Sequence, residues 1–286
     1  MDVLLVNLLH GLSWGMLLFL TSTGLTTIFG VAGVLNFAHG ALFMLGGYAA
    51  MQLGLWTGSF WAGLVLAPAA VAALGGILER ALLRPVYGRH VSFQLLLTFA
   101  LLLVLEDGVR LVWGSGYHVV SPPALLAGTV AMAGYGFPVY RLFLVVLGPL
   151  LGVGLWAMFA FTRIGKVVRA AAADREMAMA LGIHVPRLFT GVFAFGTALA
   201  ALGGALAAAH QSVGPAMGER IIIESFIVVV VGGLGSFPGA FVGALSLGLL
   251  EAFGTQLFPR AQMAIPYLLL TAILLFRPRG LFGEAA

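Results

Sequence analysis

Charged residues are so sparse in this chain that water cannot be the solvent for most of its surface. Only 8% of its 286 residues are Asp, Glu, Lys or Arg, and 61% are hydrophobic. A soluble globular domain carries about 25% charged and about 45–50% apolar residues. A chain of this length therefore lacks the polar groups that would cover a water-facing surface, and we expect a helical bundle in a lipid bilayer.

Long apolar runs predict the individual membrane helices, since a span needs roughly 20 apolar residues. The runs 221–233 and 239–254 are short and predict either two tilted spans or one broken helix. The expected fold is thus an all-α polytopic transmembrane bundle of eight or nine spans, forming one domain over residues 1–286. The candidate spans are residues 6–29, 35–56, 60–83, 92–112, 139–161, 188–210, 221–233, 239–254 and 263–277.

The basic residues predict the orientation. Three lie in segment 80–90, five in 162–187 and two in the C-terminal tail, whereas Arg110, Arg141, Arg220 and Arg260 fall on the opposite side. The positive-inside rule makes the richer side cytoplasmic. The N-terminus, which lacks the basic region and cleavage site of a secretory signal, is expected to begin the first span from outside. Because basic residues are scattered between apolar runs, a nucleic-acid partner is not expected.

A glycine-rich segment, GVLNFAHGALFMLGGY (33–48), interrupts the apolar pattern near the start of the chain. Asn36, Phe37 and His39 sit in it at or near membrane depth. Broken helices occur at this depth where they line a cavity, because their freed backbone groups must be satisfied by protein or water. These three residues are therefore candidates for a translocation pathway. A tight turn between two spans is the favoured interpretation, and it is compatible with a place beside the pathway.

The most basic loop contains a predicted amphipathic helix, RAAAADREMAMALGI (169–183). Ala170, Ala173, Met177 and Leu181 recur at helical spacing and are expected to form one face of small and apolar residues. Gly182, followed by a proline, predicts the helix end. An apolar strip on a helix between two spans favours docking onto another protein, although an ordinary solvated loop helix has the same pattern.

Charges inside predicted spans mark possible sites, because they are costly in lipid. Glu224 is the best candidate for the pathway, and Arg220 lies four residues before it at pairing distance on a helix. Glu106, Asp107 and Arg110 cluster at the outer end of the fourth span, and Glu79 and Glu251 are expected to mark span ends or helix contacts. The small-residue runs 201–209 and 239–248 predict closely packed helix seams.

The inventory of residues argues against an enzyme. There is no cysteine, and the only lysine, Lys166, lacks the glycine-rich approach and following Ser or Thr of a phosphate-binding loop. No HExxH pattern stands out either. We therefore expect no catalytic residue, metal or cofactor on this chain, and any ATP-driven step requires a separate ATPase subunit.

Three segments, in this order, resemble the LivH-type permeases of branched-chain amino acid ABC importers. They are GVLNFAHGALFMLGGY, RAAAADREMAMALGI and GGLGSFPGAFVGALSLGLLEAF (232–253). The resemblance covers nearly the whole chain. It implies an ABC importer permease fold and a multi-pass place in the bacterial inner membrane. It also implies that an ATPase-coupling segment lies within 162–187, with Asp174, Arg175, Ala178, Leu181 and Gly182 on the family pattern.

The same resemblance implies partners. They are a second, LivM-type permease, two cytoplasmic ATP-binding subunits that hold ATP and magnesium, and a periplasmic substrate-binding protein. Related permeases handle urea or aromatic and carboxylic acids, so the cargo stays open, as does the hetero- or homodimeric nature of the permease pair. Two other classes remain. An ion-coupled secondary transporter needs a charge deep in a span, for which Glu224 is the only candidate, and an oligomeric channel needs a selectivity ring, for which the sequence has no repeated polar signature.

Overall fold

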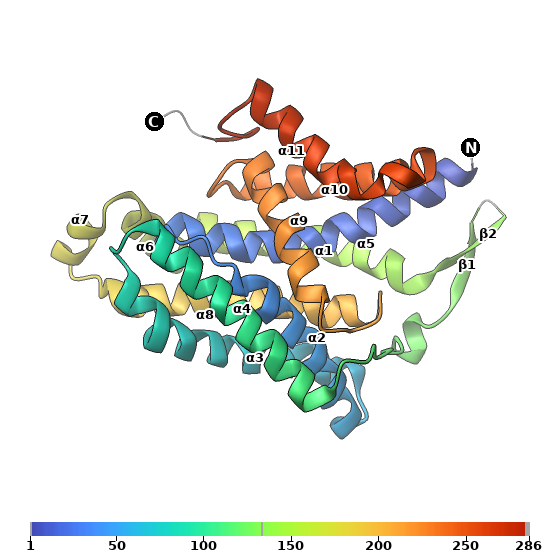
Figure 1. Cartoon of the computed structure of the whole chain (residues 1–286), viewed down its shortest axis with the longest axis horizontal. Helices are drawn as coiled ribbons and strands as arrows, with labels where there is room; N and C mark the ends of the chain where they lie inside the picture. Colours follow the sequence, from blue (N-terminus) through green and yellow to red (C-terminus); the bar gives the residue numbers. More distant parts are fainter. Residues whose placement is uncertain (1, 133, 284–286) are drawn as a thin grey trace.

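The computed structural model describes residues 2–132 and 134–283, which form an elongated bundle of helices (Figure 1). Nine helices match the nine predicted apolar runs, and two short ones, α6 and α7, lie in the most basic loop. The long helices are α1 (Asp2–Ala32), α2 (Ala38–Thr57), α3 (Phe60–Leu78), α4 (Val91–Trp113), α5 (Val139–Phe161), α8 (Val185–Ala208), α9 (Met217–Gly232), α10 (Phe237–Leu257) and α11 (Ile265–Phe276).

The all-α transmembrane prediction is confirmed. Among the described residues, six segments are long and apolar enough to cross a membrane: Leu4–Ala32, Phe60–Val86, Val139–Phe161, Val185–Ala208, Phe237–Leu257 and Pro259–Phe276. The two short apolar runs near the C-terminus are separate helices, α9 and α10, because Gly233 and Gly235 adopt positive φ angles of 105° and 83° and turn the chain between them. A small hairpin, β1 (Thr129–Met132) with β2 (Tyr135–Pro138), occupies the long loop before α5.

Helix α1 is the centre of the bundle, where it packs against α5, α8, α9 and α10. The closest approach uses glycine on both sides. A Cβ atom added at Gly11 would lie 2.8 Å from Leu249 Cα, and one added at Gly248 would lie 2.5 Å from the Gly11 carbonyl oxygen. In lipid, small residues allow backbones to approach closely enough for dispersion forces to hold helices together. The predicted seam over 239–248 is therefore confirmed.

The predicted seam over 201–209 is also confirmed, and it gives a first testable consequence. Gly204 of α8 lies against the Phe43 carbonyl of α2, with no space for a Cβ atom. We expect Gly204→Val to destabilise the protein by about 1–3 kcal/mol through overpacking, measured as a lower melting temperature in detergent. Gly154→Val is the matched control, because a Cβ at Gly154 would meet nothing within 4 Å. Equal melting temperatures for the two variants would contradict tight packing here.

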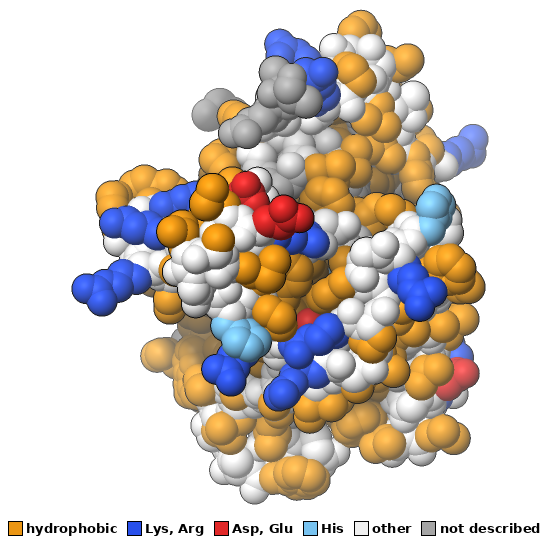
Figure 2. Space-filling model, turned by 90° about the vertical axis from the view of Figure 1, so that its left-hand side faces the viewer, with side chains coloured by type: hydrophobic (Ala, Val, Ile, Leu, Met, Phe, Trp, Pro, Cys, Tyr) orange, Lys and Arg blue, Asp and Glu red, His pale blue; other side chains and the backbone are white. Residues whose placement is uncertain are grey.

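Basic loops meet at one end of the bundle, as the charge pattern predicted. Arg84, after α3, donates to the Pro186 carbonyl oxygen at the start of α8 at 2.9 Å, and Arg175 of α7 reaches the end of α1. Figure 2 views this end and shows Lys and Arg side chains gathered on it. The opposite end carries Arg141 beside His10 and the β-hairpin.

The expected orientation can be tested by cysteine labelling, since the chain contains no native cysteine. Ser115 and Ala172 are both exposed and lie at opposite ends of the bundle. We expect Ser115→Cys to react with an impermeant thiol reagent in intact spheroplasts and Ala172→Cys to react only after lysis. Reversed labelling would invert the topology.

Candidate functional site

Residues 33–37 form an irregular, partly buried break between α1 and α2. Gly33, with φ of 67°, ends α1, and five residues later the chain starts α2. His39 then bonds through Nε2 to the Thr21 carbonyl oxygen at 2.9 Å. Thr21 lies eleven residues before the end of α1, roughly 16 Å along the helix axis. The chain therefore runs back beside α1. This path agrees with the favoured interpretation of a turn between two separate helices rather than with one broken helix.

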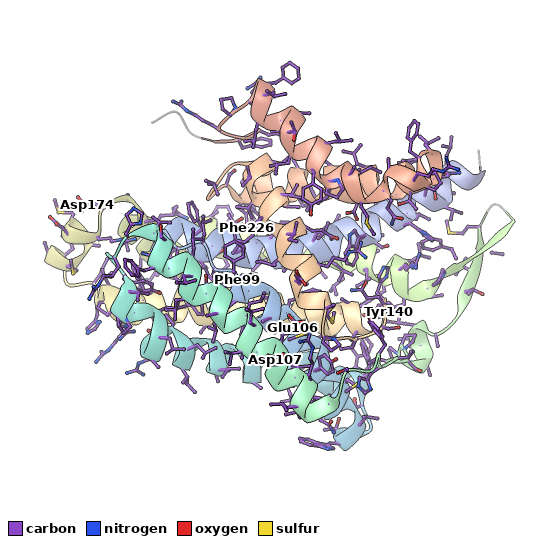
Figure 3. The ribbon with its side chains drawn as sticks, viewed as in Figure 1. Phe99, Glu106, Asp107, Tyr140, Asp174 and Phe226 are labelled. Carbon is purple, nitrogen blue, oxygen red and sulfur yellow. The ribbon has the colours of Figure 1, made fainter. Side chains whose placement is uncertain are left out.

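The residues of this break face other helices. Asn36 and His39 are fully buried. The ring of Phe37 lies 4.8 Å from that of Phe226 in α9 and 6.1 Å from that of Phe99 in α4, and Figure 3 labels both partners near the middle of the bundle. The Asn36 amide and His39 Nδ1 have no hydrogen-bond partner among the residues that the structure describes. Irregular backbone with free polar groups at membrane depth is typical of a place beside a pathway.

Glu224 lies on the other face of α9. Its side chain is 6% exposed, and its Oε1 accepts a hydrogen bond from Arg220 Nε at 2.7 Å. Gly218 and Ile222, two residues before Arg220 and Glu224, instead pack against Gly40 of α2. Positions two apart on a helix point to nearly opposite sides. The structure therefore brings Asn36, Phe37 and His39 together but places Glu224 elsewhere.

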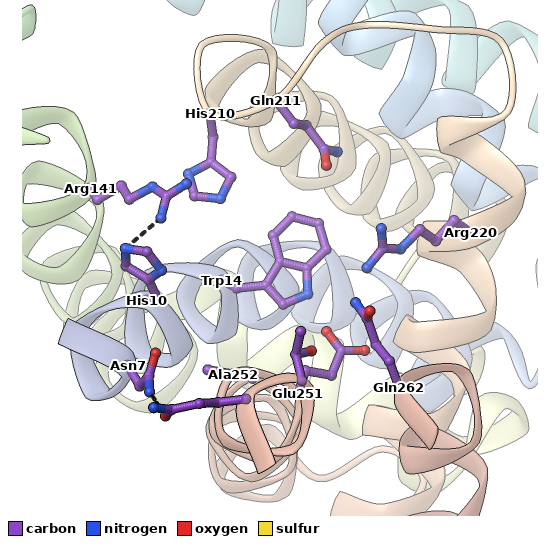
Figure 4. A pocket seen from close by; sticks show the side chains of 13 residues that line it. Asn7, His10, Trp14, Arg141, His210, Gln211, Arg220, Glu251, Ala252 and Gln262 are labelled. Atoms are coloured by element: carbon purple, nitrogen blue, oxygen red, sulfur yellow. Dashed lines mark hydrogen bonds between the residues drawn. The ribbon is translucent and has the colours of Figure 1, made fainter. Parts of the chain in front are cut away.

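Glu224 belongs to a polar hollow near the ends of α1, α9 and α10 that lie opposite the basic loops (Figure 4). A cavity of about 370 Å³ and a neighbouring one of about 500 Å³ share Arg220, Glu251 and Gln262 in their walls. Glu251, which was expected to mark a span end or a helix contact, lines both cavities. Trp14 and His210, which the sequence did not single out, line the first cavity. The sequence signal that could have indicated these cavity residues is the presence of polar and aromatic side chains in or beside otherwise apolar helices.

The segment expected to couple to an ATPase, called the coupling segment below, forms two helices, α6 (Arg163–Ala173) and α7 (Arg175–Ala180). Asp174 separates them because its Oδ1 accepts from the Met177 backbone N–H at 2.9 Å and caps the second helix. Gly182, with φ of 85°, ends the segment. The predicted helix end is confirmed, whereas the single continuous helix is wrong because the Asp174 cap starts a new one.

Two residues of this segment hold it to the bundle. Arg175 donates to the Val31 and Ala32 carbonyl oxygens at 3.2 and 3.0 Å, and its guanidinium lies 4.9 Å from the centre of the Phe189 ring. Ala178 is only 2% exposed and packs in one cluster with α1 and α8 residues. Ala178, which the resemblance placed on the coupling pattern, therefore faces the bundle and not the outer surface of the segment, because the capped helix turns this side inward.

The outward side of the segment is apolar. Met177 is 57% exposed, Met179 52% and Leu181 73%. The helix break at Asp174 divides the predicted face of Ala170, Ala173, Met177 and Leu181. Only Met177 and Leu181 form part of the exposed apolar surface. Exposed apolar side chains beside basic residues are typical of a protein contact rather than of a solvated loop.

Glu79 links α3 to α8 at the same end. It is fully buried, and its Oε2 accepts from Arg84 Nη2 at 3.1 Å and from Thr190 Oγ1 at 2.7 Å. The prediction that Glu79 makes a helix contact is confirmed. Because Arg84 also reaches the start of α8, this network holds the helix that follows the coupling segment to α3.

Long apolar helices, a buried break at mid-depth and an outward apolar surface at the basic end together define a polytopic membrane permease. The family model described as branched-chain amino acid transport system / permease component matches residues 7–276, and the chain belongs to this family.

Relatives of known role cover nearly the whole chain. It is 31% identical to the high-affinity branched-chain amino acid transport system permease protein BraD of Pseudomonas aeruginosa, and 30% identical to LivH of Escherichia coli. Each match covers 98% of this chain and 96% of the relative. A probable LivH of Methanocaldococcus jannaschii is 28% identical over 93% of this chain and 89% of its own length. The resemblance to LivH-type permeases is confirmed.

Proposed function

We propose that this chain is a LivH-type subunit of an ABC importer that moves branched-chain or other hydrophobic amino acids inward across the bacterial cytoplasmic membrane. The observation that carries the proposal is the full-length match to permeases of branched-chain amino acid systems. The exposed apolar surface of α7 supports it, because a permease driven by separate ATPases needs such a contact.

Coupling would run through α6 and α7. Met177, Met179 and Leu181 would insert into the groove of a cytoplasmic ATP-binding subunit, which holds ATP and magnesium. Movement of that subunit would reach the ends of α1 and α8 directly, because Arg175 bonds to the last carbonyls of α1 and stacks on Phe189 of α8. Both helices border the buried break, so a tilt of either one changes the surroundings of Asn36, Phe37 and His39.

The remaining partners follow from the same proposal. A second permease of the LivM type would pair with this chain in the bilayer, two ATP-binding subunits would dock on the basic end, and a periplasmic binding protein would deliver cargo to the other end. The pairing of Glu224 with Arg220 speaks against ion coupling through this carboxylate, because a guanidinium 2.7 Å away already compensates its charge.

The decisive experiment is transport by the complete complex in liposomes. We expect uptake of radiolabelled leucine to require ATP on the cytoplasmic side and to persist after protonophores collapse the ion gradients. Uptake without ATP but with a proton or sodium gradient would show a secondary transporter instead. Uptake of urea or an aromatic acid, with leucine excluded, would reassign the cargo within the same family.

A further inference from the structure

The polar hollow at the outer end contains groups that the coupling mechanism does not use. It is built from α1, α9 and α10, the loop after α8, and the segment before α11, and its two cavities meet at Arg220 and Glu251. In Figure 4, Trp14 lies at the centre, with Arg220 and Glu251 on one side of it and Arg141, His10 and His210 on the other. Volumes of 370 and 500 Å³ are within the range of small-molecule sites, roughly 300–1,000 Å³.

Arg220 presents an unused fork of N–H donors. Its Nε donates to Glu224, but neither terminal nitrogen has a hydrogen-bond acceptor within the described ranges. The guanidinium lies 5.6 Å from the centre of the Trp14 ring, which limits its orientations, and its side chain is 59% exposed. A planar fork of this kind matches a carboxylate with two parallel hydrogen bonds.

Two carboxyl groups lie beside this fork. Glu224 Oε2 is buried and has no hydrogen-bond partner among described residues, although Oε1 is bonded to Arg220. Glu251 borders both cavities and forms no ion pair in the part of the chain that the structure describes. A buried acceptor without a donor is costly, so a ligand that supplies N–H donors here would remove that cost. An ammonium group supplies three.

The remaining charged groups and the apolar lining of the cavities indicate which class of ligand fits. Arg141 donates to His10 at 2.7 Å, and burial lowers the pKa of His210 to about 4, which keeps that ring neutral at neutral pH. The walls of the two cavities together contain Arg141 and Arg220 as well as Glu219, Glu224 and Glu251, so positive and negative charges nearly balance. The larger cavity also has an apolar wall formed by Ile223, Met263, Pro266 and Tyr267.

We propose that this hollow is an amino-acid binding site on the outer side of the permease. The α-carboxylate binds the Arg220 fork, the α-ammonium binds Glu251 and the free oxygen of Glu224, and an apolar side chain lies against the wall of the larger cavity. The inference rests on the proposed function and adds the site at which the permease receives its cargo. Trp14 is a positioning residue that holds the Arg220 fork.

Binding of radiolabelled leucine to the purified permease complex, without the periplasmic binding protein, tests the site. We expect Arg220→Gln and Glu251→Gln each to weaken binding at least about ten-fold, the loss typical of one charge-assisted pair. Arg110→Gln is the matched control, since Arg110 pairs with Glu106 at the outer end of α4 in the same i,i+4 geometry and lines neither cavity.

Analogues that lack one charge assign the two ends of the ligand. Isoamylamine, which has no carboxylate, should compete equally well in native protein and Arg220→Gln. The fatty acid 4-methylpentanoate, which has no ammonium, should compete equally well in native protein and Glu251→Gln. A merely structural role for either residue would weaken both competitors alike and overturn the assignment.

Two further outcomes separate this inference from the proposed function. If both variants bind leucine with the affinity of the native protein, in a complex that imports leucine with ATP, the proposed site is wrong and the importer proposal is unaffected. A native complex that neither binds nor imports leucine would overturn the importer proposal and the site with it.

Discussion

Replacing Leu181 with glutamate should reduce both ATPase co-purification and ATP-driven uptake at least about ten-fold. Leu181 is 73% exposed at the end of the coupling segment, beside Met177 and Met179. A charge at this surface costs little in the isolated chain, but burying it unpaired in a protein contact costs several kcal/mol, and about 1.4 kcal/mol already corresponds to a ten-fold change. Pull-down of the ATP-binding subunits and uptake in liposomes measure the two effects.

Leu234→Glu is the matched control for this substitution. Leu234 is 50% exposed in the α9–α10 turn, so it tests the same change outside α6 and α7. We expect it to retain docking and uptake. Loss of docking with Leu234→Glu and full docking with Leu181→Glu would place the ATPase contact at the turn. Ala178→Arg is no substitute, because Ala178 is buried and the variant would disturb folding.

Replacing His39 with leucine should reduce uptake about ten-fold while the chain still inserts and pairs. His39 is fully buried and ties the start of α2 to the Thr21 carbonyl in the middle of α1. Losing a buried hydrogen bond typically costs about 1–3 kcal/mol, which is enough to shift an equilibrium between inward and outward access. Uptake normalised to the amount of assembled complex measures the effect.

The conservative variant makes this prediction specific. His39→Gln retains a side-chain N–H near Thr21 and should recover most of the uptake. Asn36→Leu should behave like His39→Leu, because Asn36 is also fully buried in the break. Normal uptake by both leucine variants would remove the break from the pathway.

The helices were largely predictable from sequence because the bilayer imposes a minimum apolar length on each span. The run 92–112, for example, corresponds to α4 at Val91–Trp113. The division of the segment 163–180 into two helices was less predictable. Asp174 is a favourable N-cap residue, yet the helical spacing of alanines around it favoured one continuous helix, and the cap prevailed.

The break after α1 and the outer hollow depend on tertiary contacts instead. Gly33 indicated an interruption, but the course of the following residues depends on packing against α1, α4 and α9. Trp14, Arg220 and Glu251 are far apart in sequence and meet because α10 packs along α1. Single-sequence patterns carry no information about which distant helices become neighbours, so this site could not be read from its residues.

The glycine seam between α1 and α10 has a consequence for biosynthesis. The first helix made needs a partner that lies some 200 residues later in the chain, between Phe237 and Leu257. At about 5–20 residues per second, α1 waits on the order of ten to forty seconds before the ribosome supplies it. During that interval the face of α1 that carries Gly11 and Gly15 lies uncovered by α10 in the membrane. That face of α1 is thus enclosed long after the helix itself is made.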